Sequence, residues 1–195
     1  MLLILSVFTL LDLLHPGLPI THDGVDHVAR IANFYQSLTE GNIVPRWAAN
    51  LNWGYGHPIL MFLYPLPSYI ASLFHAVGFS FVDSTKLVFA SAYVASMLGM
   101  YVWGSLVWGN TAGFIAALLY GYGPYRFVDV YIRGAIGEHV AFVSAPFILY
   151  FLHVRRSCTF TPRASSALNF SSGLSCRCRR SRRQRNTPND VPTVC

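Results

Sequence analysis

The first 154 residues are mostly apolar and carry few charges, and this feature limits what the chain can fold into. They contain only five Lys or Arg and seven Asp or Glu residues, whereas about 25% of the residues of an average soluble domain are charged. A soluble fold needs more polar surface than this to cover its core. The stretch therefore predicts an all-α, polytopic transmembrane helical bundle. We expect a multi-pass protein of the cell (plasma) membrane, in contact with membrane lipid.

From about residue 155 the composition changes abruptly, which divides the chain into a transmembrane module, 1–154, and a tail, 155–195. The tail holds nine Arg, one Asp and all four Cys residues, and the net charge of +6 comes from it. It is too polar to bury a core, so disorder is predicted. It is either a basic tail that touches anionic lipid or the product of a shifted reading frame or a truncated gene, which the break in mid-pattern favours. The module has no basic face, so no nucleic-acid partner is predicted.

Apolar segments of the module predict about four membrane-spanning helices. A further apolar segment, Ile59–Phe79, is broken by Pro65 and Pro67 and predicts an interfacial or re-entrant helix. Four spans leave the basic tail in the cytoplasm, as the positive-inside rule prefers. Five spans stay open, because an N-terminus outside the cell would satisfy the same rule. The predicted spans are Met1–Leu14, Thr85–Val107, Thr111–Tyr122 and Val140–His153.

The first polar cluster, His22, Asp23, Asp26 and His27, lies at the start of an amphipathic helix predicted over residues 25–40. Asp23 and His27 are spaced i, i+4, so both can face one site. Capping is the structural alternative, because Asp23 is a good N-cap residue and Asp26 occupies a capping-box position. Capping requires only one acid and explains neither histidine. The cluster therefore predicts a functional site.

The second polar cluster lies in the segment YRFVDVYIRGAIGEH, residues 125–139, which joins the last two predicted spans. Charged groups near membrane depth usually pair with one another or face a cavity. Anchoring at the headgroups is the structural alternative, and the i, i+4 spacing of Asp129 and Arg133 predicts a helix salt bridge. Neither alternative accounts for Glu138, which adjoins an apolar run. We therefore expect Glu138 to be functional.

With four spans, the two clusters emerge on the same, outer side of the membrane. Their acids could then share a divalent cation, Mg²⁺ or Mn²⁺, and Asp23 and Asp26 are the first candidates for its ligands. Arg133 or Arg126 could bind a phosphate group, and one acid could act as a general base. With five spans the clusters face opposite sides, and this shared site fails.

Several glycines in the apolar segments lie at positions where helices either pack closely or end. Small residues let two helix backbones approach each other, and glycine is also common where a helix stops. These glycines therefore predict helix contacts or helix ends rather than a phosphate-binding loop. They are Gly99, Gly104, Gly121 and Gly123.

The order of these motifs resembles a known group of membrane proteins. THDGVDH precedes the amphipathic helix, GYGHPILMFLYPLPSY precedes the central spans, and PYRFVDVYIRGAIGEHVAF follows them. Over residues 1–154 this order resembles the bacterial and archaeal family named "6-pyruvoyl-tetrahydropterin synthase-related domain". It is similar, more distantly, to the N-terminal part of the polytopic GT-C class of glycosyltransferases. The zinc-binding histidine set of the soluble pterin synthase is absent.

The resemblance implies sugar transfer from a polyprenyl-phosphate donor on the outer face of the membrane. It implies that Asp23 and Glu138 (or Asp129) correspond to the acids of the first and second outer loops. The chain would then be such an enzyme or an inactive N-terminal fragment of one. Two other functions stay open: a non-catalytic membrane scaffold or assembly protein, and a transporter fragment. The predicted catalytic residues are Asp23 and Glu138, and the predicted substrate-binding residues are Arg133, Arg126, His27 and Asp129.

Overall fold

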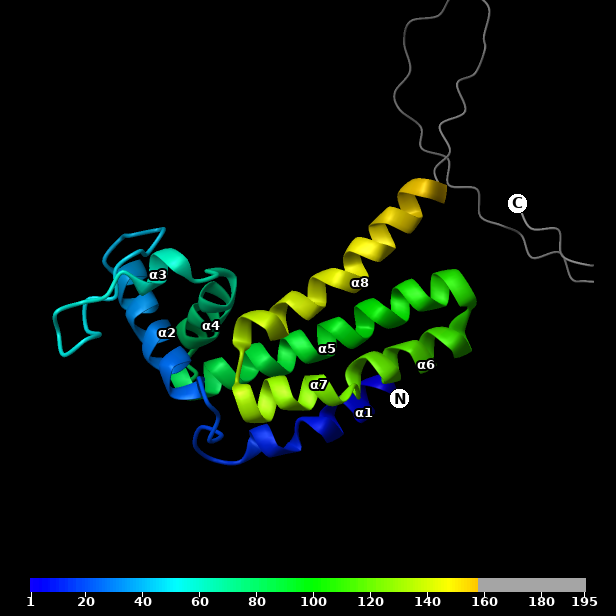
Figure 1. Ribbon diagram of the computed structural model, residues 1–195, viewed down its shortest axis with the longest axis horizontal. Helices are drawn as coiled ribbons and strands as arrows, with labels where there is room; N and C mark the ends of the chain where they lie inside the picture. Colours follow the sequence, from blue (N-terminus) through cyan, green and yellow to red (C-terminus); the bar gives the residue numbers. More distant parts are fainter. Residues whose placement is uncertain (158–195) are drawn as a thin grey trace, which may run out of the picture. The chain divides into compact units, whose positions relative to one another are not determined.

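The computed structural model describes residues 1–157, and every regular element of this part of the chain is helical. The chain divides into two compact units, Met1–Tyr150 and Phe151–Cys195, and the predictions for the tail beyond residue 157 lie outside the described residues. Figure 1 shows the elements in chain order. They are α1 (Leu2–Thr9), η1 (Leu11–Leu14), α2 (Gly24–Thr39), α3 (Ile59–Phe62), α4 (Leu66–Val77), α5 (Phe81–Trp108), α6 (Asn110–Gly121), α7 (Pro124–Phe127), η2 (Val128–Arg133) and α8 (Ile136–Ser157).

An antiparallel hairpin of α5 and α6 forms the centre of the first unit (Figure 1). α5 begins four residues before the predicted span, because Ser80 caps it: the Ser80 Oγ accepts a hydrogen bond from the Asp83 backbone N–H at 3.0 Å. Gly104 of α5 packs against Gly113 of α6 so closely that an added Cβ would lie 3.0 Å from the Gly113 Cα. The predicted use of Gly104 as a helix contact is confirmed.

α6 ends at Gly121, close to the predicted end of its span, but the chain does not become a loop. α7 begins immediately at Pro124, since proline suits the first position of a helix, and the π-helical segment η2 follows it. Residues 124–133, which join the last two predicted spans, therefore continue the helical path beside α5 (Figure 1).

Two helices are long and apolar enough to cross a membrane: α5, with 28 residues, and the 20 residues Ile136–Arg155 of α8. This favours a membrane location. The four-span bundle is not confirmed within the described residues, because α1 has only 8 residues and α6 only 12, whereas a span needs about 20. α1 packs against α5 and α6. Tyr122 and Tyr131 hold it by donating hydrogen bonds to the carbonyl oxygens of Leu5 and Thr9.

The amphipathic helix is confirmed as α2, which packs against α4 and the start of α5. Its Ile31 and Phe34 are buried, and the Phe34 ring meets Tyr69 of α4 edge-to-face. The segment Ile59–Phe79 is broken into the short helices α3 and α4 before Pro65, as predicted, whereas Pro67 lies in the first turn of α4 and does not break it. This α2–α4 part adjoins the N-terminal end of α5, which is the end at which η2 stops and α8 begins (Figure 1).

Candidate functional site

The two polar clusters meet at this end of the hairpin. The backbone N–H groups of His22 and Asp23 donate hydrogen bonds of 3.0 Å to the carbonyl oxygens of Ile132 and Arg133. Two successive backbone hydrogen bonds fix the register of one segment against the other. The start of α2 and the end of η2 are therefore held side by side, although more than a hundred residues separate them in the sequence.

The close approach depends on Gly134, directly after η2. Its φ of 70° lies in the left-handed region, where a side chain is strained. A Cβ at this position would also collide with the Thr21 side chain. Glycine is therefore needed at position 134 for two reasons, and both serve the contact between the clusters.

A cavity of about 660 Å³ opens where the segments meet. Asp23, which lies in its wall, has a side chain 44% exposed, and His22 Nδ1 lies 3.0 Å from Asp23 Oδ1. This hydrogen bond is the main cause that lowers the pKa of Asp23, so the carboxylate is ionised at neutral pH. Asp23 occupies the N-cap position of α2, but its side chain makes no capping hydrogen bond. The cavity lining is Ile20, Thr21, His22, Asp23, Ile132 and Arg133.

Arg133 also lines this cavity, and its guanidinium is held by Glu138 in a two-point ion pair. Nη1 lies 2.9 Å from Glu138 Oε2, and Nη2 lies 2.8 Å from Oε1. The Tyr125 hydroxyl donates to Oε2 at 2.6 Å and accepts from Arg133 Nη1 at 2.8 Å. Glu138 raises the pKa of both Tyr125 and Arg133. Arg133 therefore reaches the cavity as a cation whose direction is fixed by two partners.

Three other charged or titratable side chains from the second cluster are buried and lie away from the open cavity. Asp129 and His139 are fully buried, and His139 Nδ1 lies 3.4 Å from Asp129 Oδ2, an ion-pair distance rather than a good hydrogen bond. Arg126 donates to Ser96 Oγ at 2.8 Å and its guanidinium lies 4.5 Å from the Phe142 ring centroid. The predicted pair Asp129–Arg133 does not form, because Arg133 pairs with Glu138.

His27 and Asp26 lie on different faces of α2. His27 is buried, and this burial lowers its pKa against the opposing effect of the nearby Asp23 and Asp26 carboxylates. Asp26 is exposed and lies 3.4 Å from Arg30 Nη2, an i, i+4 ion pair. His27 therefore packs into the fold, and of the first cluster only His22 and Asp23 line the open cavity.

The predicted divalent-cation site requires more ligands than these residues supply. No group of three or more His, Cys, Asp or Glu side chains within residues 1–157 is close enough to hold a metal ion. Asp23 and Asp26 are each already paired, with His22 and Arg30 respectively. Because Mg²⁺ and Mn²⁺ prefer several oxygen ligands, this donor set does not fit such an ion, and no step below depends on one.

No family model, curated protein or solved structure matches this chain. The resemblance to the membrane family and to the GT-C class therefore rests on the sequence motifs alone. It stays a prediction, as do the roles assigned to Asp23, Glu138 and the substrate-binding residues.

Sequence reasoning missed two features of this region. His139 was not singled out, although it is fully buried beside Asp129 and its Nε2–H donates a hydrogen bond to the Phe89 carbonyl oxygen at 3.1 Å. Lys86 was also missed, although it is a single cation in the apolar run of α5. An isolated charge inside a predicted span was the signal available for Lys86.

Proposed function

We propose that the chain is the N-terminal membrane module of a GT-C-like glycosyltransferase, whose open cavity binds a sugar linked to a polyprenyl phosphate. The observation that carries the proposal is that Asp23 and Arg133 line one cavity, held there by the backbone hydrogen bonds of His22 and Asp23 to Ile132 and Arg133. An anionic acid and a phosphate-binding cation are the minimum that such a transfer requires.

Arg133 is suited to the phosphate of the donor. A guanidinium binds phosphate at two points and keeps its charge at any physiological pH. In the proposed complex the phosphate competes with Glu138 for the Nη groups. Arg133 then stabilises the negative charge that grows on the departing phosphate, and Glu138 is freed toward the cavity.

The transfer needs one proton acceptor and one bond exchange. The Asp23 carboxylate takes the proton of the acceptor hydroxyl as that oxygen forms a bond to the anomeric carbon of the sugar. The bond from the anomeric carbon to the phosphate oxygen breaks with its electron pair, and polyprenyl phosphate leaves. Attack opposite to the leaving group inverts the anomeric centre. Asp23 has the ionised carboxylate that this step requires.

The test is transfer of radiolabel from a polyprenyl-phosphate-linked hexose in membranes that contain the full chain. Asp23→Asn and Arg133→Gln should each reduce transfer at least about a hundredfold, the range found for loss of a general base and for loss of a group that stabilises the charge of the transition state. Glu40→Gln is the matched control, because Glu40 is an exposed acid at the other end of α2 whose carboxylate accepts a hydrogen bond from Gln36. Unchanged transfer by Asp23→Asn, or an equal loss in Glu40→Gln, would refute the assignment.

A transporter is the second candidate, and the buried Asp129 favours it. Neither carboxylate oxygen of Asp129 has a hydrogen-bond partner, although the side chain is fully buried among helices. Buried acids of this kind serve as proton sites in membrane transporters. Proton flux in proteoliposomes separates the two candidates. A transporter loses flux in Asp129→Asn and keeps it in Asp23→Asn, whereas a glycosyltransferase shows no flux in either.

A further inference from the structure

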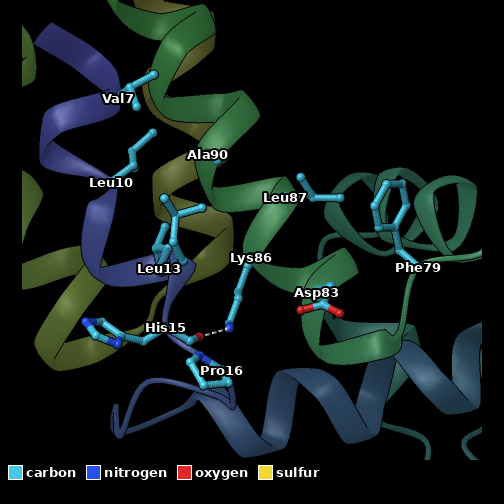
Figure 2. Close-up of a pocket in the computed structure, with 11 residues that line it drawn as sticks. Val7, Leu10, Leu13, His15, Pro16, Phe79, Asp83, Lys86, Leu87 and Ala90 are labelled. Carbon is cyan, nitrogen blue, oxygen red and sulfur yellow. Dashed lines mark hydrogen bonds between the residues drawn. The ribbon is translucent and has the colours of Figure 1, made fainter. Parts of the chain in front are cut away.

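A second cavity, which the sugar-transfer proposal does not use, lies between α1 and the first half of α5 (Figure 2). We call it the α1–α5 groove. Its volume of about 440 Å³ lies in the range of about 300–1,000 Å³ that is typical of small-molecule sites. Most of its wall is apolar, and its polar side chains gather at one end, where η1 ends. The lining residues are Val7, Leu10, Leu13, Leu14, His15, Pro16, Phe79, Asp83, Lys86, Leu87 and Ala90.

Lys86 is the feature of this groove that calls for an explanation. It is the single lysine of the chain. It lies within a candidate membrane span, and its relative exposure is only 8%. A charge in such a place usually has a functional partner.

Within residues 1–157 the Lys86 ammonium has one hydrogen-bond partner, and this partner is uncharged. Nζ donates to the carbonyl oxygen of His15 at 2.6 Å (Figure 2). An ammonium has three N–H donors, and no carboxylate within residues 1–157 forms an ion pair with it at 4.0 Å or less. Two donors and the full positive charge are therefore available to an anionic group at the end of the groove.

Asp83 adds an anion to the same end. It precedes Lys86 by three residues, so the two lie on one face of α5, and both line the groove. Its carboxylate accepts a hydrogen bond from Ser80 Oγ at 2.7 Å and remains exposed. The polar end of the groove therefore offers a cation and an anion one helical turn apart.

We propose that the α1–α5 groove binds a membrane phospholipid whose headgroup carries both a phosphate and a primary ammonium, namely phosphatidylethanolamine. The Lys86 ammonium binds the lipid phosphate, Asp83 accepts hydrogen bonds from the ethanolamine ammonium, and one acyl chain lies along the leucine-lined wall. This site stands on its own residues and does not depend on the proposed sugar transfer.

The charge pattern distinguishes this lipid from others of a bilayer. Phosphatidylglycerol has a phosphate for Lys86 but no cation for Asp83, whose carboxylate would repel it. Phosphatidylcholine has a quaternary ammonium without an N–H to donate, so it loses the hydrogen bonds to Asp83. A polyprenyl phosphate fits the apolar wall and Lys86 but leaves Asp83 without a partner. The start of α5 is also the end of a candidate span, which is the depth of lipid headgroups.

The experiment is native mass spectrometry of the full chain after exchange into mixed micelles with equal amounts of phosphatidylethanolamine, phosphatidylglycerol and phosphatidylcholine. The wild-type chain should retain phosphatidylethanolamine about tenfold over either competitor, as expected for one charge-assisted hydrogen-bonded contact. Equal retention of the three lipids, or preference for added polyprenyl phosphate, would overturn the proposal without the need for any variant.

Three variants assign the preference to its residues. Lys86→Gln should lose phosphatidylethanolamine and phosphatidylglycerol alike. Asp83→Asn should remove the discrimination against phosphatidylglycerol while lipid binding persists. Ala90→Phe should fill the apolar wall and release every lipid, whereas Glu40→Gln, far from the groove, should change nothing. A preserved lipid preference in Asp83→Asn would contradict the proposal, as would a dimer that excludes lipid from the groove. Circular dichroism is measured for every variant to verify that the variant is folded.

Discussion

The exposed Arg133–Glu138 pair and the buried Arg126–Asp129–His139 group come from the same fifteen residues of sequence but have opposite environments. The first pair is about half exposed and joined by two hydrogen bonds. The second group is buried, and several of its polar atoms lack hydrogen-bond partners. A ligand can reach the first and cannot reach the second, so charge in a sequence near a membrane does not by itself identify a binding site.

The two groups should also differ in how much they contribute to the stability of the fold. An exposed ion pair contributes little to stability, because water and salt screen it. A buried charge that loses its partner is strongly destabilising. The buried group should therefore control folding, and the exposed pair should control ligand binding.

The largest effect should come from Asp129→Ala. It leaves the buried Arg126 and His139 without their acid, and we expect the free energy of unfolding to fall by about 3–5 kcal/mol. Chemical unfolding in detergent, followed by circular dichroism, measures this change. Glu138→Ala is the comparison, since both changes remove one acid from the same cluster, and it should leave the midpoint of unfolding nearly unchanged. Similar losses in the two variants would break the distinction between the regions.

The next largest effect should come from Gly134→Ala, at the junction between the two regions. The strained φ and the collision with Thr21 together should destabilise the fold by about 1–3 kcal/mol. Gly41→Ala is a matched control, because Gly41 also has a positive φ, 92°, but nothing lies within 4 Å of an added Cβ. A loss in Gly134→Ala no greater than that in Gly41→Ala would show that the close approach of the clusters contributes nothing.

A smaller effect, dependent on pH, should distinguish buried His27 from exposed His22. Burial lowers the pKa of His27 below its ordinary value of 6.5, so the unfolded chain binds a proton at this residue more readily than the folded chain. The contribution of His27 to stability is therefore present above pH 6.5 and is lost as the pH falls toward the folded pKa. Unfolding measured between pH 7.5 and 5 should show this slope, and His27→Gln should reduce it. A slope removed by His22→Gln instead would contradict the account.

The smallest effect concerns the carboxylate of Asp23. His22 lowers the Asp23 pKa through a hydrogen bond, so His22→Ala should raise that pKa toward its ordinary value. The stability that this interaction supplies is present above the unfolded pKa and is lost as the pH falls through the folded pKa. Infrared titration of the carboxylate band, with Asp23→Asn to assign it, measures the shift. An identical titration in wild type and His22→Ala would show that the two side chains do not interact.

Much of the fold was predictable from hydrophobic periodicity. The periodic pattern predicted α2, whereas α5 and α8 were predicted from long apolar runs, and all three helices are found. The predicted glycine contacts are also found: besides Gly104, Gly99 adjoins Pro146 and Phe147, and Gly121 packs against Met97. Small residues where two helices approach are a strong local signal.

The arrangement of the second cluster was not predictable in the same way. The i, i+4 rule that paired Asp129 with Arg133 assumes an α-helix. The segment η2 is π-helical, and the Gly134 N–H bonds to the carbonyl of Asp129, five residues earlier. This wider turn rotates the two side chains apart, so that Asp129 is buried and Arg133 is exposed. The meeting of the two clusters depends on backbone hydrogen bonds between distant segments, which leave no local pattern in the sequence.

The central claim is that His22 and Asp23 of the first cluster and Arg133 of the second open into one aqueous cavity on one side of the membrane. Cysteine labelling in intact cells tests it most directly, with His22→Cys and Arg133→Cys introduced singly into a chain whose four native cysteines are serine. The account predicts that a membrane-impermeant maleimide labels both positions from the same side. Labelling of the two positions from opposite sides would contradict it.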